Sequence, residues 1–262
     1  MSLIAELELA LELADAADAI TLPPFLARDI SVEWKVDRTE VTALDRAAEA
    51  AIATRLTTER PDHRMLGEEH GVSGDPDSPW QWIVDPIDGT SGYVRGIPVW
   101  ATLIALAHGD DVVVAVVSAP ALGRRWWATA GGGTFAAGRP CRVSDVATIA
   151  NAQISVTIND GWDRLGLIPA LVELARDARR ARGFGDFWQH ALVAEGALDV
   201  AVDAIGVAPY DIAAVRLLVE EAGGTFSDRE GVATHLHDTA ISTNGLLHDE
   251  VVRRLTPGVA PA

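Results

Sequence analysis

Residues 82–90 read WIVDPIDGT, so two aspartates, Asp85 and Asp88, directly follow a run of large apolar residues. Two carboxylates three positions apart, at the mouth of a buried strand, repel each other unless a positive charge lies between them. Mg²⁺ prefers oxygen ligands, usually a few carboxylates together with water and a substrate phosphate. An Asp-Pro-Ile-Asp turn can bring both carboxylates and the Ile87 carbonyl around one small volume, with Pro86 restricting the backbone. The segment therefore predicts a site for a divalent metal ion.

The next two residues, Gly89 and Thr90, predict a second property of this site. Their backbone N–H groups can bind an anion, as loops that enter helix N-termini do. Carboxylates that hold metal ions beside amides that hold phosphate form a layout for the hydrolysis of phosphate esters.

Three further acidic places lie where the apolar pattern predicts burial: Glu68 in MLGEE, Asp211 in PYDIAAV and Asp45 in ALDRAA. Taken singly, each has an ordinary explanation. Asp45 and Asp211 can be acids at helix N-termini, worth roughly 0.5–2 kcal/mol each, and Glu68 can be a solvated loop acid. The Asp85–Asp88 pair has no such explanation, because a capping role requires one acid. We therefore interpret these acids as parts of one metal site.

Periodicity and turn signals predict the elements that must position these residues. Helices are expected over residues 3–20 and from Thr42 onward, where Thr42 and Asp45 form a capping arrangement. A loop over residues 71–79 leads into a strand over residues 81–84.

Strands dominate residues 97–140, and beyond residue 142 strands alternate with amphipathic helices. This order favours a mixed, layered α/β fold. We expect two halves, residues 1–142 with the first acidic motifs and residues 143–262 with Asp211 and the residues that set substrate specificity.

The composition is that of a soluble globular protein, with 48% apolar and 23% charged residues among 262. No apolar run approaches the roughly 20 residues that span a bilayer, and the acidic N-terminus does not resemble a signal peptide. The single cysteine, Cys141, excludes an internal disulfide and favours a cytoplasmic location. A formal net charge of −17 disfavours nucleic acid and anionic membranes as partners.

In series, these motifs resemble the inositol-monophosphatase family of Mg²⁺-dependent, lithium-sensitive phosphatases. The match runs in order along nearly the whole chain: Lys35 and VTALD, then GEE, DPIDGT, GFGDF, PYDIAA and EEAGG. Segments such as VRGIPVWATLIAL and RGFGDFWQHALVAEGALDVAV are most similar to actinobacterial-type histidinol-phosphate phosphatases. The resemblance implies a layered αβαβα sandwich of the sugar-phosphatase type, a homodimer and a small phosphorylated substrate.

The resemblance also implies how metal ions are held. Two or three Mg²⁺ ions per site are expected, with Mn²⁺ as an alternative. The first ion is expected at Glu68, Asp85 and the Ile87 carbonyl, and the second at Asp85, Asp88 and Asp211.

The remaining motif residues have roles in catalysis by the same resemblance. Phosphate is expected at Asp88 and at the amides of Gly89 and Thr90. Glu68, and Thr90 with Asp45 as its hydrogen-bond partner, are expected to orient and deprotonate a metal-activated water for in-line attack on phosphorus. Lys35 is the only lysine in the chain and falls near a family lysine that completes the site, although an ordinary surface residue is the alternative.

Two departures from the family pattern leave every metal ligand in place. Ser91-Gly92-Tyr93 occupies positions where Lys-Asn-Phe or Thr-Asn-Phe is common, and Tyr210 occupies a position where Trp is usual. Gly92 gives freedom to the turn that presents the phosphate-binding amides.

Histidinol phosphate carries an ammonium and an imidazole, so its pocket should offer carboxylates away from the metal ions. By the resemblance, Asp186 and Gly185 lie where the family places contacts to the leaving group, and Asp203 is the candidate substrate-binding acid on the other side. We therefore expect histidinol phosphate, a substrate of histidine biosynthesis. The alternatives are inositol 1-phosphate, then sugar or nucleotide phosphates, and a catalytically weak member that serves as a binding or scaffold protein.

Overall fold

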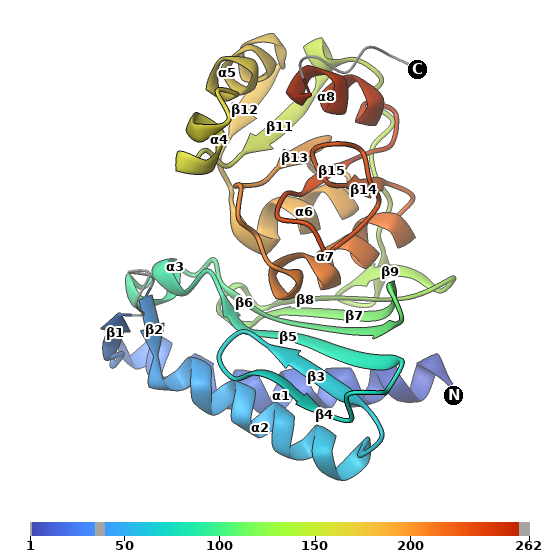
Figure 1. Ribbon diagram of the computed structural model, residues 1–262. Helices are drawn as coiled ribbons and strands as arrows, with labels where there is room; N and C mark the ends of the chain where they lie inside the picture. The colour runs from blue at the N-terminus through green and yellow to red at the C-terminus, as the bar shows by residue number, and fades with distance from the viewer. Residues whose placement is uncertain (1, 35–39, 257–262) are drawn as a thin grey trace.

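Two β-sheets alternate with three layers of helices in the computed structural model, which describes residues 2–34 and 40–256 (Figure 1). Helices α1 (Leu3–Ala27) and α2 (Ala43–Glu59) cover one face of an eight-stranded sheet. Helices α6 (Asp186–Ala194) and α7 (Pro209–Glu221) cover its other face and separate it from a five-stranded sheet. The outer layer consists of α4 (Asp160–Arg164), α5 (Ile168–Asp177) and α8 (His248–Leu255). The predicted αβαβα sandwich is confirmed.

The large sheet has the strand order β10-β9-β8-β7-β6-β5-β3-β4. Its strands are β3 (Arg64–Gly67), β4 (Gly71–Gly74), β5 (Trp80–Asp88), β6 (Ala101–His108), β7 (Asp111–Ala119), β8 (Arg124–Thr129), β9 (Gly133–Ala136) and β10 (Arg139–Pro140). Strands β3 and β5 pair in parallel, whereas β5 and β6 pair antiparallel. The prediction of an unstructured loop over residues 71–79 is therefore wrong in its first part, because β4 pairs with β3 there.

Strand β5 differs from the prediction in a way that matters for the site. The expected strand ended at Val84 and was followed by a turn, but β5 continues to Asp88. Its register against β6 shifts between Asp85 and Asp88. A bulge of this kind bends a strand and redirects side chains, and here it sets the direction of both carboxylates.

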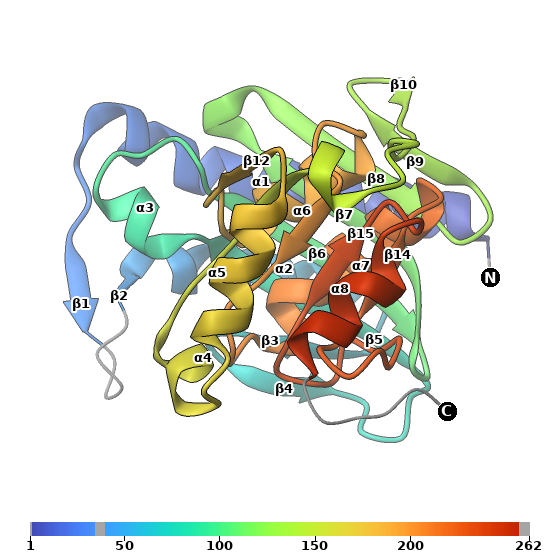
Figure 2. The same cartoon turned by 90° about the horizontal axis from the view of Figure 1, so that it is seen from above.

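The small sheet has the order β12-β11-β13-β15-β14. Its strands are β11 (Gln153–Val156), β12 (Arg180–Arg182), β13 (Val200–Val202), β14 (Thr225–Ser227) and β15 (Ile241–Thr243). Strand β14 was not predicted, and neither was the hairpin of β1 (Val32–Trp34) and β2 (Glu40–Thr42), which lies beside α3 (Thr90–Val94) in Figure 2. The two 3-10 helices are η1 (Pro120–Leu122) and η2 (Ile149–Asn151).

Alternating side chains of β5 supply the core on both faces of the large sheet. Trp82 and Val84 pack into the cluster beneath α1 and α2, whereas Ile83 packs into the cluster that α6 and α7 cover. Trp126 and Trp127 of β8 likewise belong to opposite clusters. Burial of apolar surface on both faces fixes the register of β5, because a slip of one residue would exchange its two faces.

Helix α1 is longer than the predicted span of residues 3–20 and contains Pro23 and Pro24. Its last turns bury Phe25 against Tyr93 and Trp100, with ring centroids 5.6 and 5.4 Å apart. The Tyr93 hydroxyl donates a hydrogen bond to the Thr21 carbonyl at 2.7 Å. The end of α1 therefore anchors α3. In residues 2–34 and 40–256, no helix has the length and apolar character that crossing a membrane requires.

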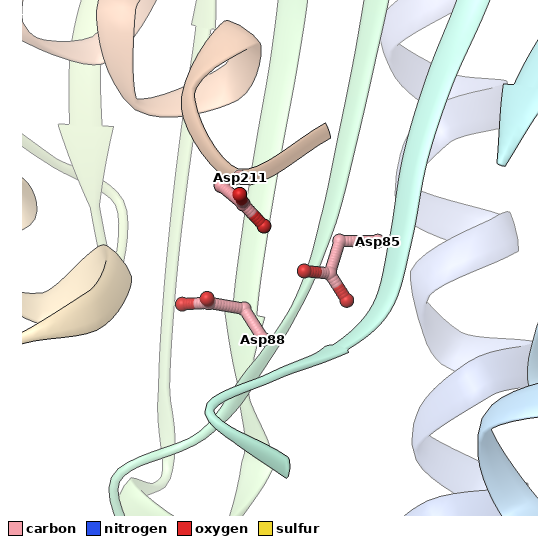
Figure 3. Close-up of side chains that lie close together, drawn as sticks. All are labelled: Asp85, Asp88 and Asp211. Carbon is pink, nitrogen blue, oxygen red and sulfur yellow. The ribbon is translucent and has the colours of Figure 1, made fainter. Parts of the chain in front are cut away.

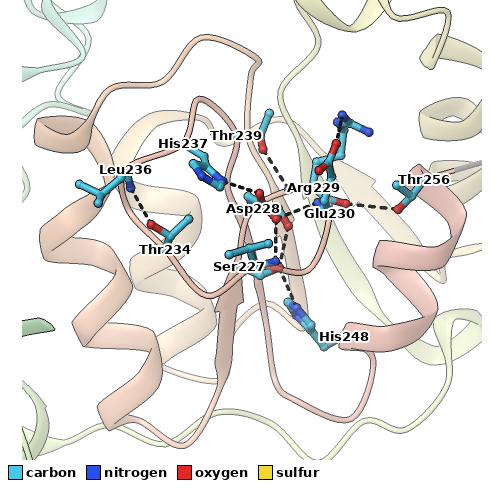
Figure 4. Close-up of polar contacts among 11 residues, drawn as sticks. Ser227, Asp228, Arg229, Glu230, Thr234, Leu236, His237, Thr239, His248 and Thr256 are labelled. Carbon is cyan, nitrogen blue, oxygen red and sulfur yellow. Dashed lines mark hydrogen bonds and ion pairs between the residues drawn. The ribbon is translucent and has the colours of Figure 1, made fainter. Parts of the chain in front are cut away.

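A polar cluster orders the loop between β14 and β15 (Figure 4). The Asp228 carboxylate accepts hydrogen bonds from the Glu230 and Val232 amides at 2.8 and 2.7 Å and lies 2.7 Å from His237 Nδ1. Ser227 Oγ lies 2.9 Å from His248 Nε2 at the start of α8. These contacts tie the loop to the last helix.

Candidate active site

Three carboxylates from two distant segments meet between the large sheet and α7 (Figure 3). Asp85 and Asp88 come from the bulged end of β5, and Asp211 comes from the first turn of α7. One carboxylate oxygen of each residue lies within 4.8 Å of the other two. Asp85 and Asp88 are buried, with 2% and 8% exposure, so their charges are poorly solvated.

Local hydrogen bonds hold the carboxylates of Asp85 and Asp211. The Ile87 amide donates to Asp85 Oδ1 at 2.9 Å, and the Thr102 hydroxyl donates to the Pro86 carbonyl at 2.9 Å. The Ala208 amide donates to Asp211 Oδ2 at 2.6 Å. Asp211 thus performs the ordinary helix-capping role that its position suggested and still faces the aspartates of β5.

The electrostatics of the cluster favour a bound cation. Burial and the charges of Glu68, Asp88 and Asp211 raise the pKa of Asp85 well above its ordinary value. Burial and the charges of Asp186 and Asp211 do the same to the pKa of Asp88, and burial with the charge of Glu68 raises the pKa of Asp211 to about 7. Like charges in a poorly solvated space destabilise one another, and a hard cation reverses that effect. The donor set therefore fits a divalent metal ion.

Glu68 approaches the cluster because β3 runs parallel to β5. Gly67 pairs with Val84, and the Glu68 amide donates to the Val84 carbonyl at 3.2 Å. Glu68 thus stands beside Asp85, and its charge contributes to the raised pKa values of both Asp85 and Asp211.

Helix α2 brings Asp45 to Thr90. Thr42 and Asp45 form the predicted capping box, with the Thr42 amide 2.8 Å from Asp45 Oδ2. The other carboxylate oxygen of Asp45 lies 3.3 Å from the Thr90 hydroxyl, which lies 2.9 Å from the Ile87 carbonyl. Asp45 is fully buried, and burial raises its pKa.

Gly89 is the N-cap residue of α3 and has a φ of 83°, which non-glycine residues rarely adopt. A Cβ atom at this position would lie 3.1 Å from the Val99 carbonyl oxygen and 3.3 Å from Asp186 Oδ2. The departures at Ser91-Gly92-Tyr93 do not detach α3, because Tyr93 is fully buried and packs edge-on against Trp100 with ring centroids 4.8 Å apart.

A second acidic pair lies beside the first cluster. Asp186 follows Gly185 at the start of α6 and has a positive φ of 47°, a strained conformation. Burial and the charge of Asp203 raise the pKa of Asp186 to about 6. The next amide, of Phe187, donates to Asp88 Oδ2 at 2.7 Å and so joins α6 to β5.

The residue that holds Asp203 was not predicted from the sequence. His190 is fully buried, with Nε2 2.9 Å from Asp203 Oδ2 and Nδ1 2.7 Å from Ser242 Oγ. Its position four residues after Asp186 on a helix was the available signal, since that spacing places two side chains on one face. Glu49, four residues after Asp45, was missed in the same way. Lys35 lies outside the described residues.

The chain is similar to known proteins over nearly its whole length. The inositol monophosphatase family matches residues 6–257. A histidinol-phosphatase of Mycobacterium tuberculosis is 47% identical over 97% of this chain and 98% of its own length. A histidinol-phosphatase of Streptomyces coelicolor is 43% identical over 94% of this chain and 95% of its own. The crystal structure of the extragenic suppressor protein suhB of Bartonella henselae covers 97% of this chain and 100% of its own, with a TM-score of 0.89 at 28% identity.

Proposed function

The chain belongs to the inositol monophosphatase family, and we propose that it hydrolyses histidinol phosphate to histidinol and inorganic phosphate with Mg²⁺ as its metal ion. Membership of this family makes it a metal-dependent phosphomonoesterase. The observation that carries the choice of substrate is the second acidic pair, Asp186 and Asp203, beside the metal-binding candidates. Full-length similarity to two histidinol-phosphatases supports the same choice.

In this proposal, Glu68, Asp85 and the Ile87 carbonyl hold one Mg²⁺, and Asp85, Asp88 and Asp211 hold another. The donor set of buried carboxylates supports this assignment. When bound, the ions activate a water molecule and stabilise the charge that develops on the leaving oxygen.

The other motif residues bind the phosphoryl group, or orient and deprotonate the attacking water. The amides of Gly89 and Thr90 face the phosphate together with Asp88. Asp45 accepts the hydrogen bond of the Thr90 hydroxyl, at 3.3 Å, and this pair orients the attacking water. Glu68 is the general base, a role that suits a carboxylate near the cluster.

The leaving group accounts for the second acidic pair. Histidinol carries an ammonium group, and a carboxylate binds an ammonium more strongly than it binds a neutral polyol. Asp186 and Asp203 would surround this group, with His190 fixing the direction of Asp203 through the 2.9 Å contact. Inositol has no positive charge to balance such a pair.

We further propose that the protein works in histidine biosynthesis in the cytoplasm and forms a homodimer. The single cysteine, Cys141, is free, which suits a reducing compartment. Resemblance to the family supports the dimer.

The test is phosphate release from histidinol phosphate and inositol 1-phosphate, measured side by side with Mg²⁺ and with a chelator. We expect Mg²⁺-dependent hydrolysis with a clear preference for histidinol phosphate. Preference for inositol 1-phosphate would contradict the substrate assignment and keep the metal chemistry. Absence of hydrolysis with both esters would contradict the assignment to histidinol phosphate and direct the search to sugar and nucleotide phosphates.

A further inference from the structure

Glu49 is a buried acid that none of the proposed catalytic steps uses. It lies on α2, is 1% exposed, and accepts two backbone hydrogen bonds. The Glu69 amide donates to its Oε2 at 2.8 Å, and the His70 amide donates to its Oε1 at 2.8 Å. His70 Nδ1 lies 2.8 Å from the same Oε1, with the His70 side chain half exposed.

These contacts enclose Glu68, the residue directly after β3 that the proposed metal site requires. The amides bonded to Glu49 belong to the two residues that follow Glu68. On the other side, a Cβ atom on Gly67 would lie 2.3 Å from the carboxylate carbon of Glu49. Only a residue without a side chain permits this approach. The carboxylate of Glu49 therefore touches the chain immediately before and immediately after Glu68.

The sequence of α2 also points to a role beyond helix stability. Asp45 and Glu49 lie one turn apart on the same buried face, and like charges at this spacing destabilise a helix. Asp45 contacts Thr90, and Glu49 contacts the segment of Glu68. The next residue along this face, Ile52, is an ordinary core residue. One face of α2 thus presents two acids to two different motifs of the site.

A carboxylate suits this position chemically. It offers acceptors on two oxygens and carries no hydrogen when ionised, so it can accept from two converging amides at once. Hydrogen bonds to an ionised acceptor are stronger than bonds between neutral groups. A glutamine would direct its NH₂ group toward one of the two amides and lose that bond.

We propose that Glu49 is a positioning residue that holds the Glu68 segment in its metal-binding conformation and thereby raises metal affinity. The inference rests on the metal-dependent function proposed above. Without the two hydrogen bonds to Glu49, residues 67–70 would have to be ordered each time the ion binds, which weakens binding. Partners that orient metal ligands typically change metal affinity by about 10- to 100-fold when they are replaced.

The experiment is Mn²⁺ binding to the full-length protein without substrate, measured by calorimetry. We expect Glu49→Gln to weaken Mn²⁺ binding by about 10-fold or more. The Mg²⁺ concentration for half-maximal activity should rise by a similar factor, while the KM at saturating Mg²⁺ stays near that of the wild type. Gly67→Ala displaces the same carboxylate from the other side and should weaken binding similarly.

Two control variants separate positioning from stability. Ile52→Val lowers the melting temperature through the same helix and should leave Mn²⁺ affinity unchanged. His70→Ala removes the ring contact but keeps both amide bonds, and should bind Mn²⁺ like the wild type. Wild-type affinity in both Glu49→Gln and Gly67→Ala would overturn the inference while leaving the metal-dependent function intact. Absence of Mn²⁺ binding by the wild type would overturn the proposed metal site and the inference with it.

Discussion

The carboxyl group of Asp186 has a pKa raised to about 6, first by burial and then by the charge of Asp203. It is therefore largely neutral at pH 5 and ionised at pH 7. Because the pKa is raised in the folded protein, the stability that this group contributes is present at low pH and is lost as the pH rises from about 4 through about 6. Binding of a cation has the opposite dependence, since it requires the ionised form. The ionised carboxyl group of Asp186 thus lowers the stability of the folded protein but is suited to binding a cationic substrate.

This titration predicts a pH-dependent substrate preference. Between pH 5 and 7, ionisation of Asp186 should lower the ratio of the KM for histidinol phosphate to the KM for inositol 1-phosphate by about 10-fold, because an ionised hydrogen-bond partner contributes about 1.5–3 kcal/mol. Dividing by the inositol value removes the ionisation of the phosphate group that both substrates share. In Asp186→Asn this fall should be absent, and the pH dependence that remains is that of the imidazole of histidinol, which titrates in the same range. The same pH dependence of the ratio in the wild type and in Asp186→Asn would contradict the assignment of Asp186.

A second prediction concerns Asp88. Burial and the charges of Asp186 and Asp211 raise the pKa of this residue well above its ordinary value. Above that ordinary value, ionisation destabilises the metal-free protein. Asp88→Asn removes the charge and retains an acceptor for the Phe187 amide. In chelator at pH 7 the variant should melt a few degrees above the wild type, since 1 kcal/mol corresponds to about 2–4 °C in chains of this size.

Thermal melts with and without Mg²⁺ check this prediction. Mg²⁺ should raise the melting temperature of the wild type more than that of Asp88→Asn, which loses a carboxylate from the cluster. The exposed acid Asp62 offers a matched control, and Asp62→Asn should behave as the wild type does under both conditions. Equal melting temperatures of Asp88→Asn and the wild type in chelator would contradict the prediction that the charge of Asp88 destabilises the metal-free protein.

At the scale of elements, the turn from β5 into α3 decides how the phosphate-binding amides are presented. Gly89→Ala would place a methyl group 3.1 Å from the Val99 carbonyl oxygen, in addition to the cost of a φ of 83°. We expect kcat/KM to fall by about 100-fold or more, since small misplacements of reacting groups have effects of this size. Activity and thermal melts are the measurements.

Gly123 provides the matched control for this substitution. It also has a positive φ, of 63°, but a Cβ atom there would meet nothing within 4 Å. Gly123→Ala should therefore lose about 1–2 kcal/mol of stability and keep its activity. Comparable loss of activity in both variants would mean that backbone strain alone, and no feature of the turn, explains the effect at Gly89.

The elements that the sequence predicts well are those with a strong local signal. The capping box of Thr42 and Asp45 fixes the start of α2, and runs of apolar residues separated by turn-like segments mark β6 to β8. The bulge of β5 and the short strand β14 lack such signals, because they form only when β6 and β15 lie alongside them. Glu49 and His190 were missed for a related reason: their partners are backbone amides and side chains far away in the sequence.

At the scale of the whole molecule, the two sheets share one core. The cluster between them joins Leu103 and Trp126 of the large sheet to Phe187 of α6 and Val215 of α7. Trp126 and Phe187 lie with their ring centroids 6.0 Å apart. In the sequence, the boundary between residues 142 and 143 separates the strands of the large sheet from those of the small sheet. In space, residues from both sides of this boundary form the shared core. The boundary also separates Asp85 and Asp88 from Asp211.

This arrangement predicts that the protein unfolds as one cooperative unit. Residues 1–142 expressed alone would expose the face of the large sheet that α6 and α7 cover, so we expect them to aggregate and to bind hydrophobic dyes. In the full chain, tryptophan fluorescence and far-UV circular dichroism should report one coincident denaturant transition, which Mg²⁺ shifts as a whole because its proposed ligands come from both sides of the boundary. A soluble, cooperatively melting fragment of residues 1–142, or two separate transitions in the full chain, would show that the shared core does not couple the halves.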